Sequence, residues 1–238
     1  MGVSSKISRI TEYYTRHGFK AMIRRAQVSL NRVLYANRVF VFYLDLTRQT
    51  LRPIALPSSC KIDRIRTAGG LSAQDLEAMV NIWNPTLARR NMAERFAKDA
   101  ELWIIKSGEQ LAGYCWTIRG KAIAPYYFPI AQDDVQLFDV YALPQFRGGG
   151  TTWYLIGSML HALQADGVAR VYADMAEWNR PSLAFYKMTP FRPLGLARSF
   201  VIGGRRFTYW DEGEVAEQVQ KAIKGRTSAR VMARPHEQ

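Results

Sequence analysis

The sequence predicts an α/β protein built on a mixed sheet, and three observations carry this prediction. From residue 101 onward, short apolar stretches typical of strands alternate with longer segments that have helical spacing. A glycine-rich turn at residues 144–152 joins one such strand to one such helix. Hydrophobic residues make up 48% of the 238 residues and charged residues 22%, which supports a packed core and excludes global disorder.

In the first part of the chain, local signals predict helices on either side of two strands. Residues 5–36 contain no proline and repeat apolar residues at helical spacing, which predicts two helical pieces hinged near Gly18. Ser72 is expected to cap a helix, with Asp75 three residues later as an approximate capping box. The expected elements are a strand at 38–46, a short strand at 61–66, a helix from Ser72 and a helix at 85–98.

The second part of the chain predicts most of the sheet. A turn at Ser107 and Gly108 separates two apolar runs, which is the pattern of a hairpin. The expected elements are strands at 102–105, 111–118 and 135–143, a helix at 149–165, a strand at 169–175, a helix at 180–187 and a last strand pair around Phe200 and Phe207.

The net charge of +13 is concentrated at the two ends of the chain. Residues 1–58 hold ten Lys or Arg against Glu12 and Asp45, which gives +8, and residues 225–238 hold three arginines against Glu237, which gives +2. The remaining residues share only +3. We therefore divide the chain into a basic, helical N-terminal extension with a following strand (1–58), a main domain (59–211), and a C-terminal helix with a basic tail (212–238).

Three interpretations of the basic extension stay open. It is a docking face for an anionic membrane, a nucleic-acid contact, or a helical brace packed on the main domain. Nucleic acid is the weakest of these, because no recognised binding motif accompanies the charge. No apolar stretch long enough to span a membrane and no signal core is visible, so we expect a cytoplasmic protein, with peripheral membrane association as the variant of that expectation. The oligomeric state is not predicted.

Neither the cysteines nor the histidines form a metal-binding pattern. Cys60 and Cys115 are far apart, and His17, His161 and His236 show no paired-ligand spacing. We expect no metal site.

The turn at residues 144–152 is the feature that most directly indicates a ligand. Glycines let backbone amides approach a phosphate closely, and the following helix offers free N–H groups at its positive end. A nucleotide-hydrolase phosphate loop would need a lysine after Gly150, and a dinucleotide fold would need a glycine in place of Trp153. A diphosphate group is the ligand that fits, although the turn taken alone leaves a purely structural role open.

Two sequence motifs at the appropriate separation favour a bound diphosphate over a purely structural turn. Arg147, Gly150 and Thr152 resemble the Gln/Arg-x-x-Gly-x-Gly/Ala pattern of motif A of the GNAT superfamily of acyl-CoA-dependent N-acetyltransferases, with Thr152 in the place of the last small residue. Residues 179–191, with Asn179 and Tyr186, resemble motif B, and Pro190 stands where a glycine is usual. The resemblance covers roughly residues 61–211 and implies a GNAT-like fold.

The resemblance also implies acetyl-CoA, or another short acyl-CoA, as co-substrate. The strand that ends at Tyr141, Ala142 and Leu143 would splay from its neighbour and let the pantetheine arm pair with its backbone. Asn179 would bond the pantetheine and Arg180 would reach the nucleotide end. The residues implied to contact the cofactor are Tyr141, Ala142, Leu143, Arg147, Gly148, Gly149, Gly150, Thr151, Thr152, Asn179, Arg180 and Ser182.

Amine attack on a thioester needs a deprotonated nucleophile and a proton for the departing thiolate. By resemblance, Tyr186 donates that proton. Asp139 and Glu177 are the candidates for a general base, and a water chain is the alternative to both. The acceptor side is expected at the helices within 72–98 and at the aromatic run 126–128, whose residues are equally compatible with a place in the core.

The predicted function is acyl transfer from CoA to a primary amine of a small molecule or sugar precursor. The basic extension motivates the further hypothesis that this occurs at the membrane surface, in envelope polysaccharide biosynthesis. The competing hypothesis is a catalytically inactive GNAT-like module that binds CoA or a partner through its basic arm. A nucleic-acid-binding protein with a structural glycine turn is the third hypothesis.

Overall fold

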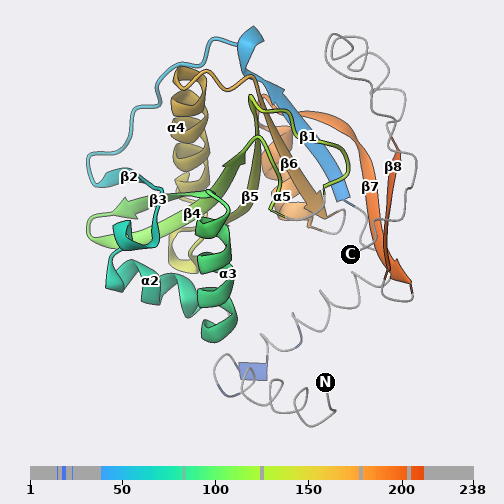
Figure 1. The fold of residues 1–238 in the computed structure, drawn as a ribbon. Helices are drawn as coiled ribbons and strands as arrows, with labels where there is room; N and C mark the ends of the chain where they lie inside the picture. Colours follow the sequence, from blue (N-terminus) through green and yellow to red (C-terminus); the bar gives the residue numbers. More distant parts are fainter. Residues whose placement is uncertain are drawn as a thin grey trace.

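A computed structural model gives the three-dimensional structure of the chain (Figure 1). It describes residues 39–82, 84–123, 126–176, 179–202 and 205–211, together with Thr15, Gly18, Phe19 and Ile23; at 180, 199–202, 205, 206, 208 and 211 the description is of the backbone alone. The predictions of paired N-terminal helices and of a C-terminal helix with a basic tail fall mainly on residues outside this description.

The described residues form one mixed sheet with the strand order β2-β3-β4-β5-β6-β1-β7-β8. Neighbouring strands are antiparallel, except that β5 and β6 run parallel. The predicted mixed sheet is therefore confirmed. The strands are β1 (Val39–Asp45), β2 (Cys60–Ile65), β3 (Glu101–Ser107), β4 (Gln110–Arg119), β5 (Asp134–Ala142), β6 (Arg170–Ala176), β7 (Arg192–Ile202) and β8 (Arg205–Asp211).

Helices cover both faces of the sheet. Successive side chains of a strand point to opposite faces, and in β3 Leu102 packs with the cluster that holds α2 and α3, while Trp103 packs with the cluster that holds α4 and α5. The helices are α2 (Ala73–Val80), α3 (Pro85–Ala97), α4 (Thr151–Ala165) and α5 (Arg180–Lys187). All four begin within two residues of the positions that the sequence predicts.

The start of α2 has the expected capping chemistry. The amide of Asp75 donates to the Ser72 hydroxyl oxygen at 3.1 Å, and that hydroxyl donates to the Asp75 carboxylate at 2.6 Å. Asn84 caps α3 in the same way, since its side-chain oxygen accepts from the amide of Leu87 at 3.0 Å.

The first described strand is an internal strand of the sheet. β1 pairs with β6 along its whole length, from Val39 opposite Ala176 to Asp45 opposite Arg170, and its other edge pairs with β7. The sequence division assigned residues 39–45 to the N-terminal extension. In the structure they lie in the same sheet as the strands of residues 60–211, between β6 and β7, where both backbone edges of β1 are paired.

Beside β1, the face that carries α2 and α3 is covered by the loop between β4 and β5. Its aromatic rings pack on one another and on Tyr172, with ring centroids 5.2 Å apart for Tyr126 and Phe128 and 5.1 Å for Phe128 and Tyr172. Val41 and Tyr43 of β1 belong to the same cluster. Among the described residues, it is this loop that covers that part of the sheet.

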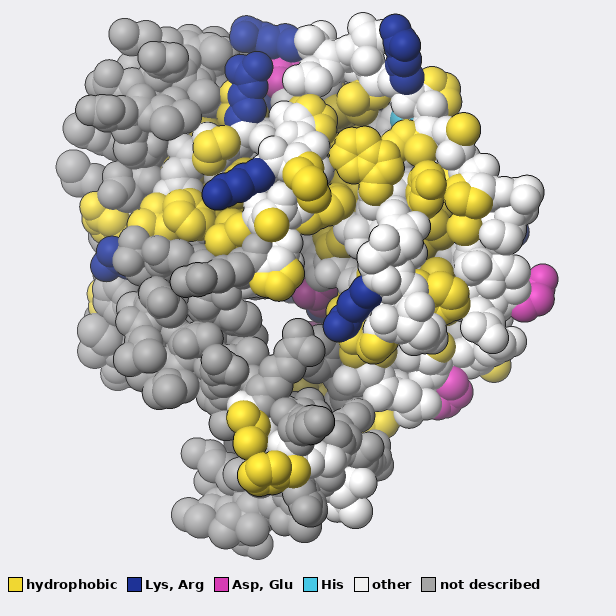
Figure 2. All heavy atoms as spheres, turned by 180° about the vertical axis from the view of Figure 1, so that it is seen from behind, with side chains coloured by type: hydrophobic (Ala, Val, Ile, Leu, Met, Phe, Trp, Pro, Cys, Tyr) yellow, Lys and Arg dark blue, Asp and Glu magenta, His cyan; other side chains and the backbone are white. Residues whose placement is uncertain are grey.

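The opposite face, with α4 and α5, carries many hydrophobic side chains at its surface (Figure 2). Trp153 on the first turn of α4 is 45% exposed, and Met188 after α5 is 72% exposed. Within the described part of the chain, none of the helices is both long enough and apolar enough to cross a membrane.

Candidate functional site

The parallel pair β5 and β6 separates halfway along its length. Residue pairing runs from Asp134 opposite Arg170 to Leu137 opposite Ala173 and then stops. β5 continues to Ala142 and β6 to Ala176, so the two strands diverge below the point where they last pair (Figure 1). Among the described residues, no strand therefore pairs with this edge of the second half of β5. This is the splay that the sequence resemblance implies.

A β-bulge in β5 explains the separation. On the β4 side the register shifts between Tyr114, opposite Tyr141, and Trp116, opposite Phe138, which leaves extra residues on β5. One of them, Asp139, has a φ of 49°, in the left-handed region that non-glycine residues rarely adopt. A bulge bends its strand and increases the local twist, and here it turns the end of β5 away from β6.

The glycine loop follows directly from this free edge. Gly148 and Gly150 have φ values of 85° and 79°, which a side chain would strain. Gly150 precedes the first residue of α4, and within the described residues no side chain caps this helix start. The Thr151 hydroxyl instead donates to the carbonyl of Phe146 at 2.9 Å. Among the described residues, the first amides of α4 thus have no side-chain cap, which is the arrangement that the sequence analysis expects of a diphosphate site.

Arg147 fastens the loop to the end of β5. Its Nε donates to the carbonyl oxygen of Ala142 at 3.1 Å, and its guanidinium lies 5.3 Å from the centre of the Tyr141 ring. The sequence analysis expects Arg147 to contact the cofactor, and these contacts support a further role, which is to fix the loop against β5. Leu143 is buried, and its amide donates to the carbonyl of Ala112 on β4. Thr152 lies half-buried on the first turn of α4.

The second motif lies across the gap, at the end of β6 and on α5. Asn179 is the N-cap residue of α5, and its side chain makes no capping hydrogen bond among the described residues. Ser182 is half-buried on the first turn. Arg180 begins the helix, and its side chain lies outside the described part of the chain, as does the whole of Glu177.

Tyr186 projects from α5 into the core beside the gap. It is only 4% exposed, and its ring contacts Phe42 of β1 at 5.3 Å and Phe191 at 5.1 Å between centroids. Burial, together with the nearby Cys115 and Asp174, raises the pKa of Tyr186 above its ordinary value. The phenol therefore keeps its proton at neutral pH, which an acid requires. Cys115 is fully buried, and burial raises the pKa of its thiol too.

Asp139, one of the two predicted bases, is engaged elsewhere. Its carboxylate forms an ion pair with Arg95 of α3, and its side chain is 54% exposed. The guanidinium of Arg95 in turn lies 5.2 Å from the ring centre of Trp116. These contacts hold Asp139 toward α3.

The sequence analysis missed a carboxylate that the structure places beside the gap. Asp174 of β6 comes immediately after Ala173, the last residue of β6 that pairs with β5. Burial raises the pKa of Asp174 from 3.8 to about 6; a hydrogen bond from Gln136 opposes this shift, and the negative charge of Asp139 adds to it. A charged residue at a sheet-facing position of an apolar strand was the available signal in the sequence.

The sequence matches the family model of the acetyltransferase (GNAT) family over residues 71–189, which is half of the chain. The chain belongs to the GNAT family. The match covers α2 to α5, and therefore includes the diverging strands, the glycine loop and Tyr186. Membership of this family indicates acyl-CoA-dependent N-acetyl transfer in general terms.

Solved structures resemble this GNAT chain at low sequence identity. A Drosophila protein is 16% identical with a TM-score of 0.48, and the match covers 67% of this chain and 48% of that one. A GNAT-family protein from Novosphingobium aromaticivorans is 14% identical with a TM-score of 0.46, over 67% and 61%. A tandem GNAT protein from the clavulanic acid biosynthesis pathway is 15% identical with a TM-score of 0.49, over 66% and 50%. The matched region thus spans about half to three fifths of those chains. Comparison with curated proteins gives no match.

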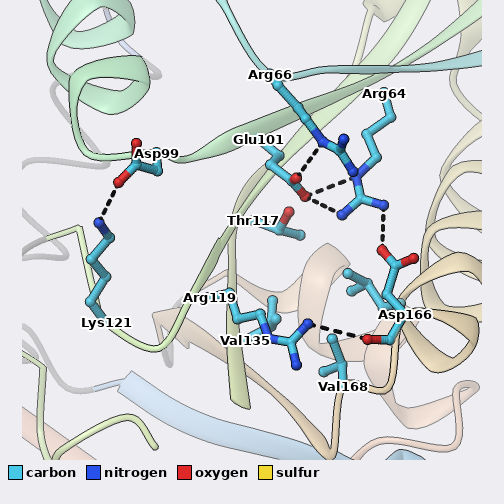
Figure 3. A pocket seen from close by; sticks show the side chains of 11 residues that line it. Arg64, Arg66, Asp99, Glu101, Thr117, Arg119, Lys121, Val135, Asp166 and Val168 are labelled. Atoms are coloured by element: carbon cyan, nitrogen blue, oxygen red, sulfur yellow. Dashed lines mark hydrogen bonds and ion pairs between the residues drawn. The ribbon is translucent and has the colours of Figure 1, made fainter. Parts of the chain in front are cut away.

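A separate cavity of about 470 Å³ lies at the opposite end of the sheet (Figure 3). Arg64 of β2 donates to Glu101 of β3 and also pairs with Asp166, which follows α4. Lys121 pairs with Asp99 across the cavity, with 2.8 Å between the charged atoms. The charged groups satisfy one another, so this GNAT chain uses the cluster to tie β2, β3 and the end of α4 together. None of the predicted site residues lines this cavity.

Proposed function

We propose that this chain transfers an acetyl or other short acyl group from acyl-CoA to the primary amine of a small molecule, by direct attack of the amine on the thioester. The observation that carries the proposal is the second half of β5, which pairs with β4 on one edge and with no described strand on the other, and which leads through the glycine loop into a helix start without a side-chain cap among the described residues. A strand edge followed by an anion-binding helix start can bind acyl-CoA, because its extended, amide-containing pantetheine arm ends in a diphosphate.

The cofactor is held mainly by backbone groups in this proposal. The pantetheine arm pairs with β5 near Tyr141, Ala142 and Leu143, and the diphosphate accepts from amides between Gly148 and Thr152. Arg147 keeps these two parts in register, since it joins the loop to the Ala142 carbonyl. The residues implied for the far side of the arm, Asn179 and Ser182, lie on the first turn of α5.

Tyr186 is the proton donor to the departing thiolate. Its protonated state follows from its raised pKa, for which burial is the main cause. Ring contacts with Phe42 and Phe191 fix its orientation, so little motion is needed during the reaction. A positioned general acid contributes typically 10²- to 10⁴-fold to the rate.

A release assay for the CoA thiol tests the proposal. The wild-type protein should release thiol from acetyl-CoA in the presence of at least one member of a panel of primary amines. Tyr186→Phe should lower kcat by about 10²-fold or more, by the usual contribution of a general acid. Tyr209→Phe makes the same chemical change at a tyrosine that is 53% exposed on β8, and should leave turnover unchanged.

Arg147→Ala should instead raise the KM for acetyl-CoA, because it frees the glycine loop from β5. Tight CoA binding without thiol release for any amine would refute the catalytic proposal and support a CoA-binding module. Loss of CoA binding altogether would refute both.

In an extended form of this proposal, the acceptor is a lipid-linked sugar precursor and the reaction occurs at the membrane surface. This extension is supported only by the charge of +8 on residues 1–58. Sedimentation with vesicles tests it. The full chain should pellet with anionic vesicles at low salt and stay in solution with neutral ones. Equal partition with both would refute the membrane association.

A further inference from the structure

Asp174 lies at the point where β5 and β6 separate. It is the residue of β6 that follows the last pair with β5, so it borders the gap that the proposed function assigns to acyl-CoA. On its other edge Asp174 is opposite Val41 of β1, which holds β6 in place along its whole length. The carboxylate is therefore fixed at the mouth of the gap by a strand that does not take part in the opening.

Gln136 of β5 orients this carboxylate. The Oε1 atom of Gln136 accepts from the amide of Ile123 at 3.1 Å, which leaves its Nε2 group to donate to Asp174. Gln136 is 5% exposed, so its side chain is fixed by packing as well as by hydrogen bonds. An amide donor held in this way keeps one side of the carboxylate occupied and aims the other.

A second polar group next to Asp174 lacks a partner. The hydroxyl oxygen of Tyr126 is buried and has no hydrogen-bond partner among the described residues. Burial raises the pKa of Tyr126, and the charge of Asp174 adds to the shift, so the two groups are close in space. A buried polar atom without a partner is costly in a folded protein, and a bound polar ligand removes this cost.

Tyr186 approaches the same carboxylate from α5, since Asp174 also contributes to its raised pKa. Asp174 and Tyr126 belong to the face with the aromatic loop, and Tyr186 to the face with α4 and α5. A carboxylate and a phenol thus lie on opposite faces of the sheet, near the point where β5 and β6 separate.

The Asp174 carboxylate itself supplies a negative charge at this point. The charged group that acts on Asp174 is the carboxylate of Asp139, and Arg95, the nearest partner of Asp139, is already paired with it. Among the described residues, no Lys or Arg forms an ion pair with Asp174. Such a site attracts an ammonium group and repels a carboxylate.

We infer that Asp174, oriented by Gln136 and accompanied by Tyr126, is the acceptor site of the proposed transferase: it binds the ammonium group, removes its proton as general base, and selects primary amines that carry no carboxylate beside the nitrogen. The aromatic rings of Phe128 and Tyr172 favour an apolar or aromatic body on that amine. This inference rests on the proposed function.

The protons balance in this scheme. The ammonium group gives one proton to Asp174, and the free amine forms a C–N bond to the thioester carbonyl carbon. The C–S bond breaks, the thiolate takes the Tyr186 proton, and the proton that the nitrogen loses next returns to the Tyr186 oxygen. Asp174 releases its proton to solvent, so the products are the amide, CoA thiol and one proton.

Asp174→Asn tests the role of the base, because the amide keeps the volume and can still accept from Gln136. We expect kcat to fall by 10²- to 10⁴-fold at pH 7, with unchanged CoA affinity by calorimetric titration. The loss should shrink steadily as the pH rises toward 10, because the amine then arrives deprotonated. The groups that face Asp174 and titrate are Asp139, Tyr126 and Tyr186.

Two further variants make this test decisive. Asp99→Asn replaces a carboxylate that is 85% exposed at the far end of the sheet, and should not change activity. Asp139→Asn tests the competing base. The inference is overturned if Asp139→Asn loses more activity than Asp174→Asn, or if the loss in Asp174→Asn does not depend on pH. Absence of thiol release in the wild-type protein with every amine would instead count against the proposed function itself.

Matched amines test the selectivity. Tyramine should be a better acceptor than tyrosine, and phenethylamine better than phenylalanine, by about 300-fold in kcat/KM. This is the size expected when two unit charges lie about 5 Å apart at an effective dielectric constant of about 20. The preference should fall in Asp174→Asn. Equal use of the amine and its amino acid by the wild-type protein would overturn the inference.

Discussion

Replacing Asp174 by asparagine should stabilise the protein at neutral pH even though it removes the proposed base. Burial raises the pKa of this carboxyl from 3.8 to about 6, so folding disfavours its charged form. Because the pKa of Asp174 is higher in the folded than in the unfolded state, its carboxyl contributes favourably to folding stability below about pH 4, and this contribution is lost as the pH rises through about 6. Above about pH 6, burial of the charged carboxylate destabilises the folded state, whereas the uncharged asparagine amide has no such effect.

The size of the effect follows from the shift. A change of about two pKa units corresponds to about 3 kcal/mol at about 1.4 kcal/mol per unit, which is the upper limit of the gain at pH 8. At pH 5, between the two pKa values, roughly half of this gain should remain. The amide also needs partners for its two new N–H donors, and the Tyr126 hydroxyl oxygen is available as an acceptor.

Urea unfolding at pH 5 and pH 8 measures the difference. The denaturation midpoint of Asp174→Asn should exceed that of the wild-type protein at both pH values, and by more at pH 8. Asp99→Asn, an exposed carboxylate, should change little at either pH. A gain that is equal at the two pH values, or a loss of stability at pH 8, would show that the Asp174 carboxyl is not destabilised by burial.

Three other substitutions should separate the functions of the site and its supports. Gly150→Ala should lower the free energy of unfolding by about 1–2 kcal/mol in chemical denaturation and weaken CoA binding, because φ at Gly150 is 79° and the added Cβ would lie 3.1 Å from the Tyr154 ring. Gly149→Ala is the control: the added Cβ has its nearest contact at 3.9 Å and should not alter stability. Phe42→Leu should lower the free energy of unfolding by about 1–3 kcal/mol. It should also lower kcat more than it raises KM for acetyl-CoA, because it removes a ring contact that orients Tyr186, the proposed proton donor. Glu101→Gln should cost about 1–2 kcal/mol, less at high salt, and leave CoA binding intact. These assignments would be contradicted by unaltered stability in Gly150→Ala, by a change in KM alone in Phe42→Leu, or by weakened CoA binding in Glu101→Gln.

Local chemistry explains why most elements were predictable. The Ser72 cap, the turn at Gly108 and the glycine loop each specify a conformation through residues close in sequence, and each has the expected geometry. The implied splay of the strand that ends at Tyr141, Ala142 and Leu143 also agrees with the observed register. The contacts between its residues and a cofactor remain predictions.

The features that the sequence did not predict depend on pairing between distant segments. The apolar residues of β1 specify a strand but not its partners, β6 and β7, which lie more than a hundred residues away. Asp174 stands out as a charged residue in an apolar strand, but only the end of the pairing between β5 and β6 places it beside the gap. The bulge at Asp139 is equally hidden, because only the register against β4 reveals it.

The position of β1 has a consequence for how the chain can fold. β1 is the first described strand to leave the ribosome, yet both of its edges stay unpaired until residues 170–202 have been made. Pairs so far apart in sequence close slowly, because the loop entropy is lost before the contacts are gained. We therefore expect an intermediate in which β2 to β5 are assembled while β1 remains exposed and prone to pair with other chains, so that folding yield should depend on protein concentration more strongly than native stability does.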